Sequence, residues 1–111
     1  MVGEKPRVAF LGTSTFAVPT LEALASTDYR PLRVYTRPDR PSGRGRLLQA
    51  PPVKARALEL GLQVYQPESV RTLKVVDDLQ SLRPDVLVVA AYGAILPREV
   101  LAVAPLGALN L

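Results

Sequence analysis

The stretch VLVVAA at residues 86–91 decides the fold class of this chain. Its side chains are aliphatic throughout, so a strand formed here has no polar face to turn toward water. Strands of this kind lie in the middle of parallel sheets, where crossover helices cover both faces. We therefore expect residues 86–91 to form the central strand of a parallel sheet.

The segments around this strand alternate between short β-prone runs and helical patterns. The expected strands are 7–11, 32–36, 62–65, 86–91 and the beginning of one at 106–111. Four helices separate them, so successive crossovers are right-handed and the strands run parallel. We expect a Rossmann-like α/β sheet in the order 3-2-1-4-5, with helices on both faces and ligands at the carboxyl ends of the strands. No internal repeat or domain linker interrupts this pattern.

Capping residues and prolines mark the helices. The first follows the hydroxyl residues 13–15, and the second begins at Pro51–Pro52 and ends at Gly61, which suits a left-handed position after a helix. We expect Ser69 to cap the third helix. The buried stripe of that helix should consist of every third or fourth residue, namely Leu73, Val76, Leu79 and Leu82. Pro97 opens a short fourth helix.

The residues 37–46, RPDRPSGRGR, have neither helical nor strand period, so we expect a long loop. Residues 36–58 contain six basic residues and one aspartate, a net charge of +5, while the whole chain carries +4. A polyanionic partner should therefore meet the protein here. A solvated arm is the alternative. If nucleic acid binds, backbone contact is expected, because no aromatic ladder is present to stack bases.

The amino-acid composition limits the kinds of chemistry that the chain can perform. The 111 residues fit one domain and contain neither cysteine nor histidine. The absence of cysteine is typical of a reducing compartment and removes disulfides and thiolate ligands. No apolar run approaches the length of a membrane span, and residues 1–7 lack a secretory signal, so we expect a cytoplasmic protein. Any proton transfer would fall to a carboxylate, lysine or tyrosine, and the missing histidine suggests truncation.

Three places at the expected carboxyl edge are candidate sites. The turn from Gly12 to Ala17 lacks the later glycines of a dinucleotide fingerprint, which disfavours nicotinamide and flavin cofactors. It is either a capped helix start or a set of N–H and hydroxyl groups facing a polar substrate. Residues 91–97, AYGAILP, are either a corner with a tucked tyrosine or a backbone surface for a flat heterocycle. Asn110 is either a turn former or an amide donor to an oxyanion.

Taken together, residues 10–19, 36–46, 52–54, 91–97 and 109–111 resemble the methionyl-tRNA formyltransferase family, and the match runs from end to end. The arginine and glycine loop is its most specific part, because glycinamide ribonucleotide formyltransferases and the hydrolase domain of formyltetrahydrofolate dehydrogenase lack that insertion in this form. The resemblance implies formyl transfer from 10-formyltetrahydrofolate to methionine on initiator tRNA, in translation initiation and without a metal.

The resemblance also implies roles for individual residues. The folate would be held mainly through backbone by Tyr92, Gly93, Ala94, Ile95 and Leu96. The tRNA acceptor end would meet the loop, and the aminoacyl group would meet the turn after the first strand, with Phe16 the main contact there. The substrate-binding residues so implied are Gly12, Thr13, Phe16, Arg37, Arg40, Arg44, Arg46 and Lys54, with Arg44 foremost in the loop.

Catalysis in that family uses an Asn-x-His pair and a later aspartate. Asn110 supplies the first member, and the histidine would fall at position 112. Residues 1–111 would then be the N-terminal part of a catalytic domain, without its remainder or the tRNA-binding barrel domain, and inactive alone. The last strand would be an open edge, which favours self-association. Other folate-dependent formyltransferases or hydrolases, and a non-catalytic flavodoxin-like binding module, are the alternatives.

Overall fold

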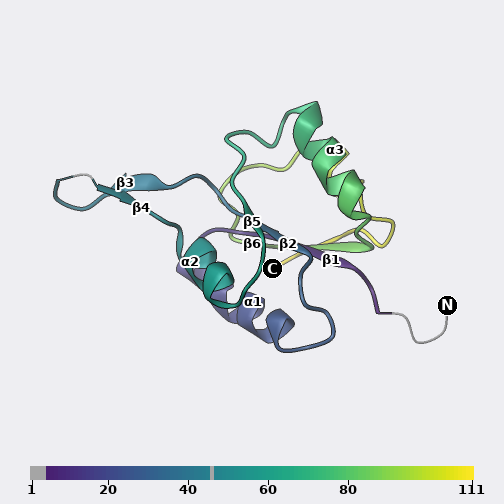
Figure 1. The fold of residues 1–111 in the computed structure, drawn as a ribbon. Coiled ribbons are helices and arrows are strands. Elements are labelled where there is room, and N and C mark those ends of the chain that lie inside the picture. Colours follow the sequence, from purple (N-terminus) through teal and green to yellow (C-terminus); the bar gives the residue numbers. More distant parts are fainter. Residues whose placement is uncertain (1–4, 46) are drawn as a thin grey trace.

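The computed structural model describes residues 5–45 and 47–111, and the described part contains a parallel sheet, helices on both of its faces and a projecting hairpin (Figure 1). The strands of the sheet are β1 Val8–Gly12, β2 Arg33–Tyr35, β5 Val64–Tyr65, β6 Val86–Ala90 and β7 Ala108–Asn110. The helices are η1 Thr15–Ala17, α1 Val18–Ala25, α2 Pro52–Glu59, α3 Leu73–Leu82 and α4 Arg98–Leu101. None of these helices is long and apolar enough to cross a bilayer.

The sheet order is β5-β2-β1-β6-β7, and every pair in it is parallel. In chain order of the predicted strands this is 3-2-1-4-5, so the predicted topology and fold class are confirmed. The central pair is β1 and β6, which align over five residues from Val8 with Val86 to Gly12 with Ala90. The chain order reverses between these two strands, so their carboxyl ends form the switch point of the sheet.

The alternation of side chains along the two central strands builds two cores. Ala9 and Leu11 of β1 point to the face covered by α3 and α4, where Leu79 and Val100 are fully buried. Their neighbours in β1 point to the face covered by α1 and α2, where Leu21 and Val53 are fully buried. Figure 1 shows α1 and α2 on one side of the sheet and α3 on the other. The double covering explains why residues 86–91 carry no polar face.

The predicted loop at residues 37–46 is instead part of an antiparallel hairpin. Its strands are β3 Arg40–Ser42 and β4 Leu47–Gln49, which pair Arg40 with Gln49 and Pro41 with Leu48. Arginine, proline and glycine gave no strand period, but the pairing is local and needs no buried face. We call residues 37–50 the arm; it projects from the sheet in Figure 1.

Two details of the predicted helices are corrected by the structure. The cap of α3 is Thr72, whose hydroxyl accepts a hydrogen bond from Val75 N, whereas Ser69 accepts one from Arg71 N in the preceding turn. Leu73 of the predicted stripe is 79% exposed, because a helix that starts one residue after Thr72 turns Val75 and Leu79 inward. Gly61 does follow α2 in a left-handed conformation, as predicted.

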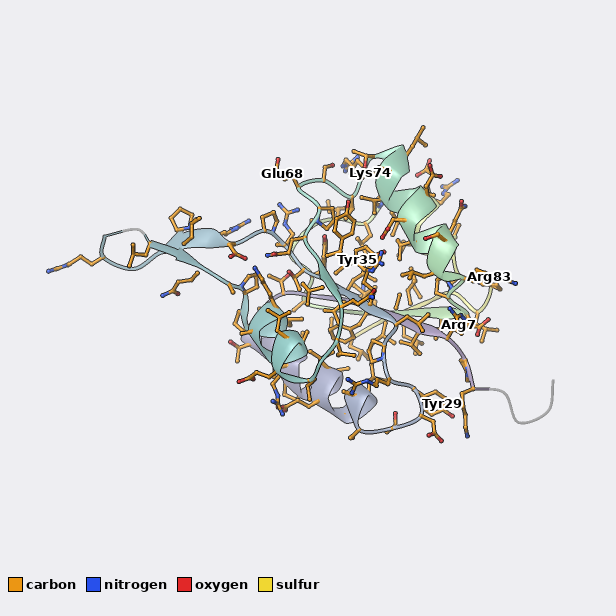
Figure 2. The ribbon with its side chains drawn as sticks, viewed as in Figure 1. Arg7, Tyr29, Tyr35, Glu68, Lys74 and Arg83 are labelled. Atoms are coloured by element: carbon orange, nitrogen blue, oxygen red, sulfur yellow. The ribbon has the colours of Figure 1, made fainter. Side chains whose placement is uncertain are left out.

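A polar link fastens α3 to β2. Asp78 of α3 accepts hydrogen bonds from Arg33 at 2.6 Å and from the hydroxyl of Tyr35, which lies under α3 in Figure 2. Burial alone would raise the pKa of the Asp78 carboxyl, but the hydrogen bonds from Arg33 and Tyr35 outweigh it, so the pKa is lowered. The link contributes an ion pair to the half-buried margin of the α3 core.

Candidate functional site

The carboxyl ends of β1, β2 and β6 lie side by side and bring two of the predicted sites together. Leu11 pairs with Tyr35, and Gly12 pairs with Ala90, so the chain leaves all three strands at one edge. A cleft of about 350 Å³ opens there. Its lining comes from the turn after β1, the arm, the start of α2 and the corner after β6, and includes Thr13, Ser14, Arg37, Arg40, Gln49 and Gly93.

Gly12 serves the packing of this edge. A β-carbon added to Gly12 would lie 2.8 Å from the carbonyl oxygen of Ala90 and 2.8 Å from the Phe10 ring. Both distances are shorter than van der Waals contact, so a larger residue has no room. The close approach that Gly12 permits is to its own sheet neighbours, and the sequence-based role of Gly12 in substrate binding stays a prediction.

Thr13 connects the elements around the cleft. Its N–H donates to Ala91 O at 3.0 Å, and its hydroxyl donates to Tyr92 O and accepts from Arg37 N at 3.1 Å. Its carbonyl oxygen accepts from Val53 N at 3.2 Å. The hypothesis that the amides of this turn face a ligand is wrong for Thr13, because its N–H is engaged within the protein.

The base of the arm is held by a small polar network. Asp39 accepts hydrogen bonds from Lys54 Nζ at 3.1 Å and from Gln66 Nε2 at 2.6 Å, and Gln66 Nε2 also donates to Arg37 O at 3.1 Å. These hydrogen bonds, from Gln66 first and Lys54 second, lower the pKa of the Asp39 carboxyl. Lys54, predicted to bind substrate, therefore forms an ion pair with Asp39 within the protein.

Sequence reasoning missed Asp39 and Gln66 as functional positions. The sequence indicates Asp39 only as the single acidic residue of the basic segment, and it predicts no role for Gln66. The signal was present for Asp39, because a lone carboxylate among six basic residues is a natural ion-pair partner. Nothing in the sequence links Gln66 to the arm, since the contact depends on β5 lying beside β2.

Arg37 points back toward the protein. Its Nη1 donates to Glu68 O at 3.1 Å, and its Nε is buried without a hydrogen-bond partner among the described residues. A β-carbon on Gly93 would lie 3.6 Å from Arg37 Cγ, so this side chain packs beside the corner after β6. Arg37 thus joins the arm to that corner.

The outer part of the arm is exposed. Arg40 and Arg44 reach solvent, and neither forms an ion pair with any residue of the described ranges. Leu47 and Leu48 of β4 are 73% and 70% exposed. Arg46, predicted to bind substrate, lies outside the described residues. The arm therefore offers uncompensated positive charge and apolar surface together.

The corner at residues 91–97 has a buried anchor and an exposed rim. Tyr92 is 2% exposed, and its hydroxyl has no hydrogen-bond partner in the described part of the chain. Burial raises the pKa of that hydroxyl, although the Arg37 guanidinium opposes the shift. Gly93, Ala94 and Ile95 are exposed and Leu96 is half-buried. The tucked tyrosine is confirmed, and the rim residues are exposed to solvent.

Asn110 and Phe16 lie near the cleft's edge of the sheet without lining the cleft. Asn110 ends β7, pairs with Val89 and is exposed. Phe16, in η1, is 74% exposed. The structure therefore brings the arm, the turn and the corner into one cleft and leaves Asn110 at the same edge, beyond β6.

A larger cavity of about 490 Å³ lies at the opposite, amino edge of the sheet, next to Arg7, Arg83 and Asp85. Arg7 donates through Nε and Nη2 to Leu82 O at 3.2 and 2.8 Å, and its N–H donates to Asp85 at 2.7 Å. These contacts satisfy the last carbonyl groups of α3. Figure 2 shows Arg7 and Arg83 together at that end of α3. The polar groups there have structural partners, so the carboxyl edge is the better candidate.

Comparison with known proteins agrees with this geometry. The family model described as "Formyl transferase" matches residues 6–111. A methionyl-tRNA formyltransferase of Roseiflexus castenholzii is 56% identical over 106 residues, which cover 95% of this chain and 34% of the relative. One of Chloroflexus aggregans is 53% identical over 105 residues, again 95% of this chain and 34% of the relative. The chain thus spans about a third of the length of these curated relatives.

A solved structure shares the fold. The phosphoribosylglycinamide formyltransferase of Streptococcus pneumoniae superposes with a TM-score of 0.66 at 17% identity, covering 96% of this chain and 56% of that one. At this identity the likeness concerns the arrangement of strands and helices. Because the family model covers nearly all of the sequence, the chain belongs to the formyl transferase family.

Proposed function

We propose that these residues are the N-terminal part of the catalytic domain of an enzyme that formylates methionyl-initiator tRNA, in the cytoplasm, at the start of translation. The formyl donor is 10-formyltetrahydrofolate. The family assignment and the names of relatives near 50% identity support the reaction. The observation that carries the proposal is the arm, which lines the cleft at the switch point of the sheet through Arg40 and carries Arg44 further out, both without an ion-pair partner among the described residues.

The arm is assigned to the tRNA acceptor end. Arginine forks suit phosphate oxygens, and Arg40 and Arg44 have no competing carboxylate among the described residues. The exposed leucines of β4 add apolar surface on the same hairpin. Phe16, equally exposed in η1 just before α1, is assigned to the methionyl side chain. Lys54 contributes by holding the arm through Asp39.

The corner is assigned to the folate. Gly93, Ala94 and Ile95 are exposed residues whose backbone N–H and C=O groups are assigned to the edge of a pterin, while the buried Tyr92 anchors the segment. A flat ring needs small neighbours, which Gly93 and Ala94 supply. Leu96 closes the rim as it turns back into the α3 core.

The chemistry needs an oxyanion donor. The methionine amine attacks the formyl carbon, the carbonyl oxygen becomes an alkoxide, the amine loses a proton, and the C–N bond to the folate breaks with return of a proton to tetrahydrofolate. The Asn110 side-chain amide at the end of β7 is assigned to that alkoxide, a contribution of about 3 kcal/mol in a preorganised site. The partner groups for the proton are expected beyond residue 111, so residues 1–111 alone should transfer no formyl group.

An acceptor competition tests the proposal. The full-length protein, supplied with labelled 10-formyltetrahydrofolate, should formylate methionyl-initiator tRNA in preference to glycinamide ribonucleotide, and should release little formate to water. Preference for the ribonucleotide, or hydrolysis alone, would favour a sister formyltransferase or a hydrolase. Absence of folate binding would favour a non-catalytic module.

The open edge of β7 leads to a proposal about the isolated chain. In the described sheet β7 pairs only with β6, and Leu106, Leu109 and Leu111 around it are 69%, 59% and 62% exposed. Unpaired strand edges recruit further strands. Residues 1–111 should therefore self-associate as concentration rises, and a sedimentation series that finds only monomer would contradict this.

A further inference from the structure

The hydroxyl of Thr13 stands between the arm and the corner. It accepts from Arg37 N, the first N–H of the arm, and donates to Tyr92 O, the first carbonyl of the rim. A hydroxyl has one hydrogen to donate, so this arrangement fixes the orientation of the donor and leaves the lone pairs for Arg37. One side-chain oxygen thus links two segments that are 55 residues apart in sequence.

The backbone of Thr13 is itself held by hydrogen bonds. Its N–H is bonded to Ala91 O and its carbonyl to Val53 N, so both peptide groups are held. Thr13 itself is half-buried at the floor of the cleft. The β-branched side chain has few χ1 wells, and both hydrogen bonds of the hydroxyl favour the observed one, so a movement of the rim carbonyl at Tyr92 is passed to Arg37 through this hydroxyl.

The segments at the two ends of this link are the ones assigned to different substrates. Arg37 opens the arm, and its carbonyl is held by Gln66, which also binds Asp39 at the base of β3. Tyr92 opens the rim assigned to the folate. Energetic coupling between sites is carried by hydrogen-bond networks of this kind, and it must act in both directions.

We propose that Thr13 is a positioning residue whose hydroxyl couples the folate corner to the arm, so that a pterin on the rim orders the arm for RNA. The identity of the two coupled ligands rests on the proposed function. The mechanical link does not, because it follows from the hydrogen bonds alone. Thr13 touches neither reacting atom, and it acts through Tyr92 O and Arg37 N.

Hydrogen exchange measured by mass spectrometry tests the link in the full-length protein without ligand. Thr13→Val keeps the shape and removes both hydrogen bonds, and should raise exchange about threefold or more in residues 37–50 and in residues 92–96 together. Thr13→Ser restores the hydroxyl and should behave like the wild type. Ser14→Ala is the matched control, because Ser14 is exposed and makes no side-chain cap bond. Peptides from β1 and β6 report whether the core stays folded.

A second measurement adds tetrahydrofolate as the probe. Exchange should fall on the rim in every variant, and should fall in the arm of the wild type and of Thr13→Ser but not of Thr13→Val. Thr13→Ala replaces Thr13→Val, with the same expectation, if β1 and β6 lose protection.

Three results would overturn the coupling. The first is that Thr13→Val changes exchange in one segment alone or in neither. The second is that tetrahydrofolate protects the rim of the wild type without protecting its arm. The third is that Ser14→Ala reproduces the effect. If tetrahydrofolate protects no segment, the proposed function fails, and the ligand-free comparison still decides the link.

Discussion

The central strands and the arm differ in what their sequences specify. All five residues of β1 are buried, and so are four of the five in β6, while the three residues of β4 are all exposed. The strands carry aliphatic residues packed between two helical layers, and the arm carries uncompensated arginines. Stability should therefore depend on the strands and ligand binding on the arm. Truncating an exposed side chain of the arm should leave stability almost untouched, and conservative changes in the strands should leave ligand binding almost untouched.

The largest expected effect comes from a core truncation. Leu87→Ala removes a fully buried side chain of β6 and should lower the free energy of unfolding by about 2–5 kcal/mol. Leu48→Ala, on the arm, removes a side chain that is 70% exposed and should change it by less than about 0.5 kcal/mol. Urea titrations of both variants measure the difference, and equal losses would break the comparison.

The glycines sharpen the comparison, because each region needs its glycine for a different reason. Gly12→Ala forces a methyl group against Ala90 O and the Phe10 ring, which should cost about 1–3 kcal/mol by overpacking. Gly43, in the turn of the arm, has open space around it and a φ of +69°. Gly43→Ala should cost about 1 kcal/mol through the backbone, and Gly43→Asn should recover part of it. Thermal unfolding of the three variants separates the two causes.

Substitutions at the base of the arm test whether Lys54 promotes tRNA binding by its charge or by holding the arm in position. If Lys54 holds the arm through Asp39, then Lys54→Met and Asp39→Asn should each raise the KM for methionyl-tRNA about threefold to fivefold in the full-length protein. A pure charge contact predicts opposite signs, because Asp39→Asn makes the segment more positive. Glu59→Gln, which removes a carboxylate from the end of α2, is the matched control and should change nothing.

The smallest effect is a dependence of stability on pH. The pKa of Asp78 is lowered in the folded state, so its contribution is complete above its unfolded pKa of about 3.9 and is lost as the pH falls through the folded value. Asp78→Asn should flatten the fall of unfolding free energy below about pH 4. The pKa of Asp39 is lowered as well, but Asp39 holds the arm and not the core. Asp39→Asn should leave most of the acid dependence in place.

The parts of the fold that follow from side-chain period were predictable. Residues 86–91 predicted a doubly covered strand, and β6 with its neighbours confirms the order of the whole sheet. The hairpin of the arm was not predictable, because Arg40–Ser42 and Leu47–Gln49 pair locally without a buried face, and a segment rich in arginine, proline and glycine shows no strand period. The cap of α3 was placed three residues early, because Ser69 and Thr72 offer the same hydroxyl and only packing chooses between them.

For the candidate site, the position could be predicted from the sequence and the internal contacts could not. Its position followed from topology, because the turn, the arm and the corner all leave strands at the carboxyl edge. The contacts within it did not follow, since the roles of Asp39, Gln66 and Thr13 depend on which strands become neighbours. Thr13 was predicted to bind substrate, and neither its residue type nor its neighbours in the sequence indicated the hydrogen bonds to Arg37 and Tyr92.

The kinetics of Arg44→Glu in the full-length protein test the central claim most directly, namely that the arm contacts tRNA and makes no direct contact with the folate. Lys74→Glu is the control, because Lys74 is exposed on α3, away from the arm (Figure 2). We predict that Arg44→Glu raises the KM for methionyl-tRNA at least about tenfold and leaves the KM for 10-formyltetrahydrofolate within about twofold, while Lys74→Glu changes neither. Equal increases in both KM values, or an unchanged KM for methionyl-tRNA, would contradict the account.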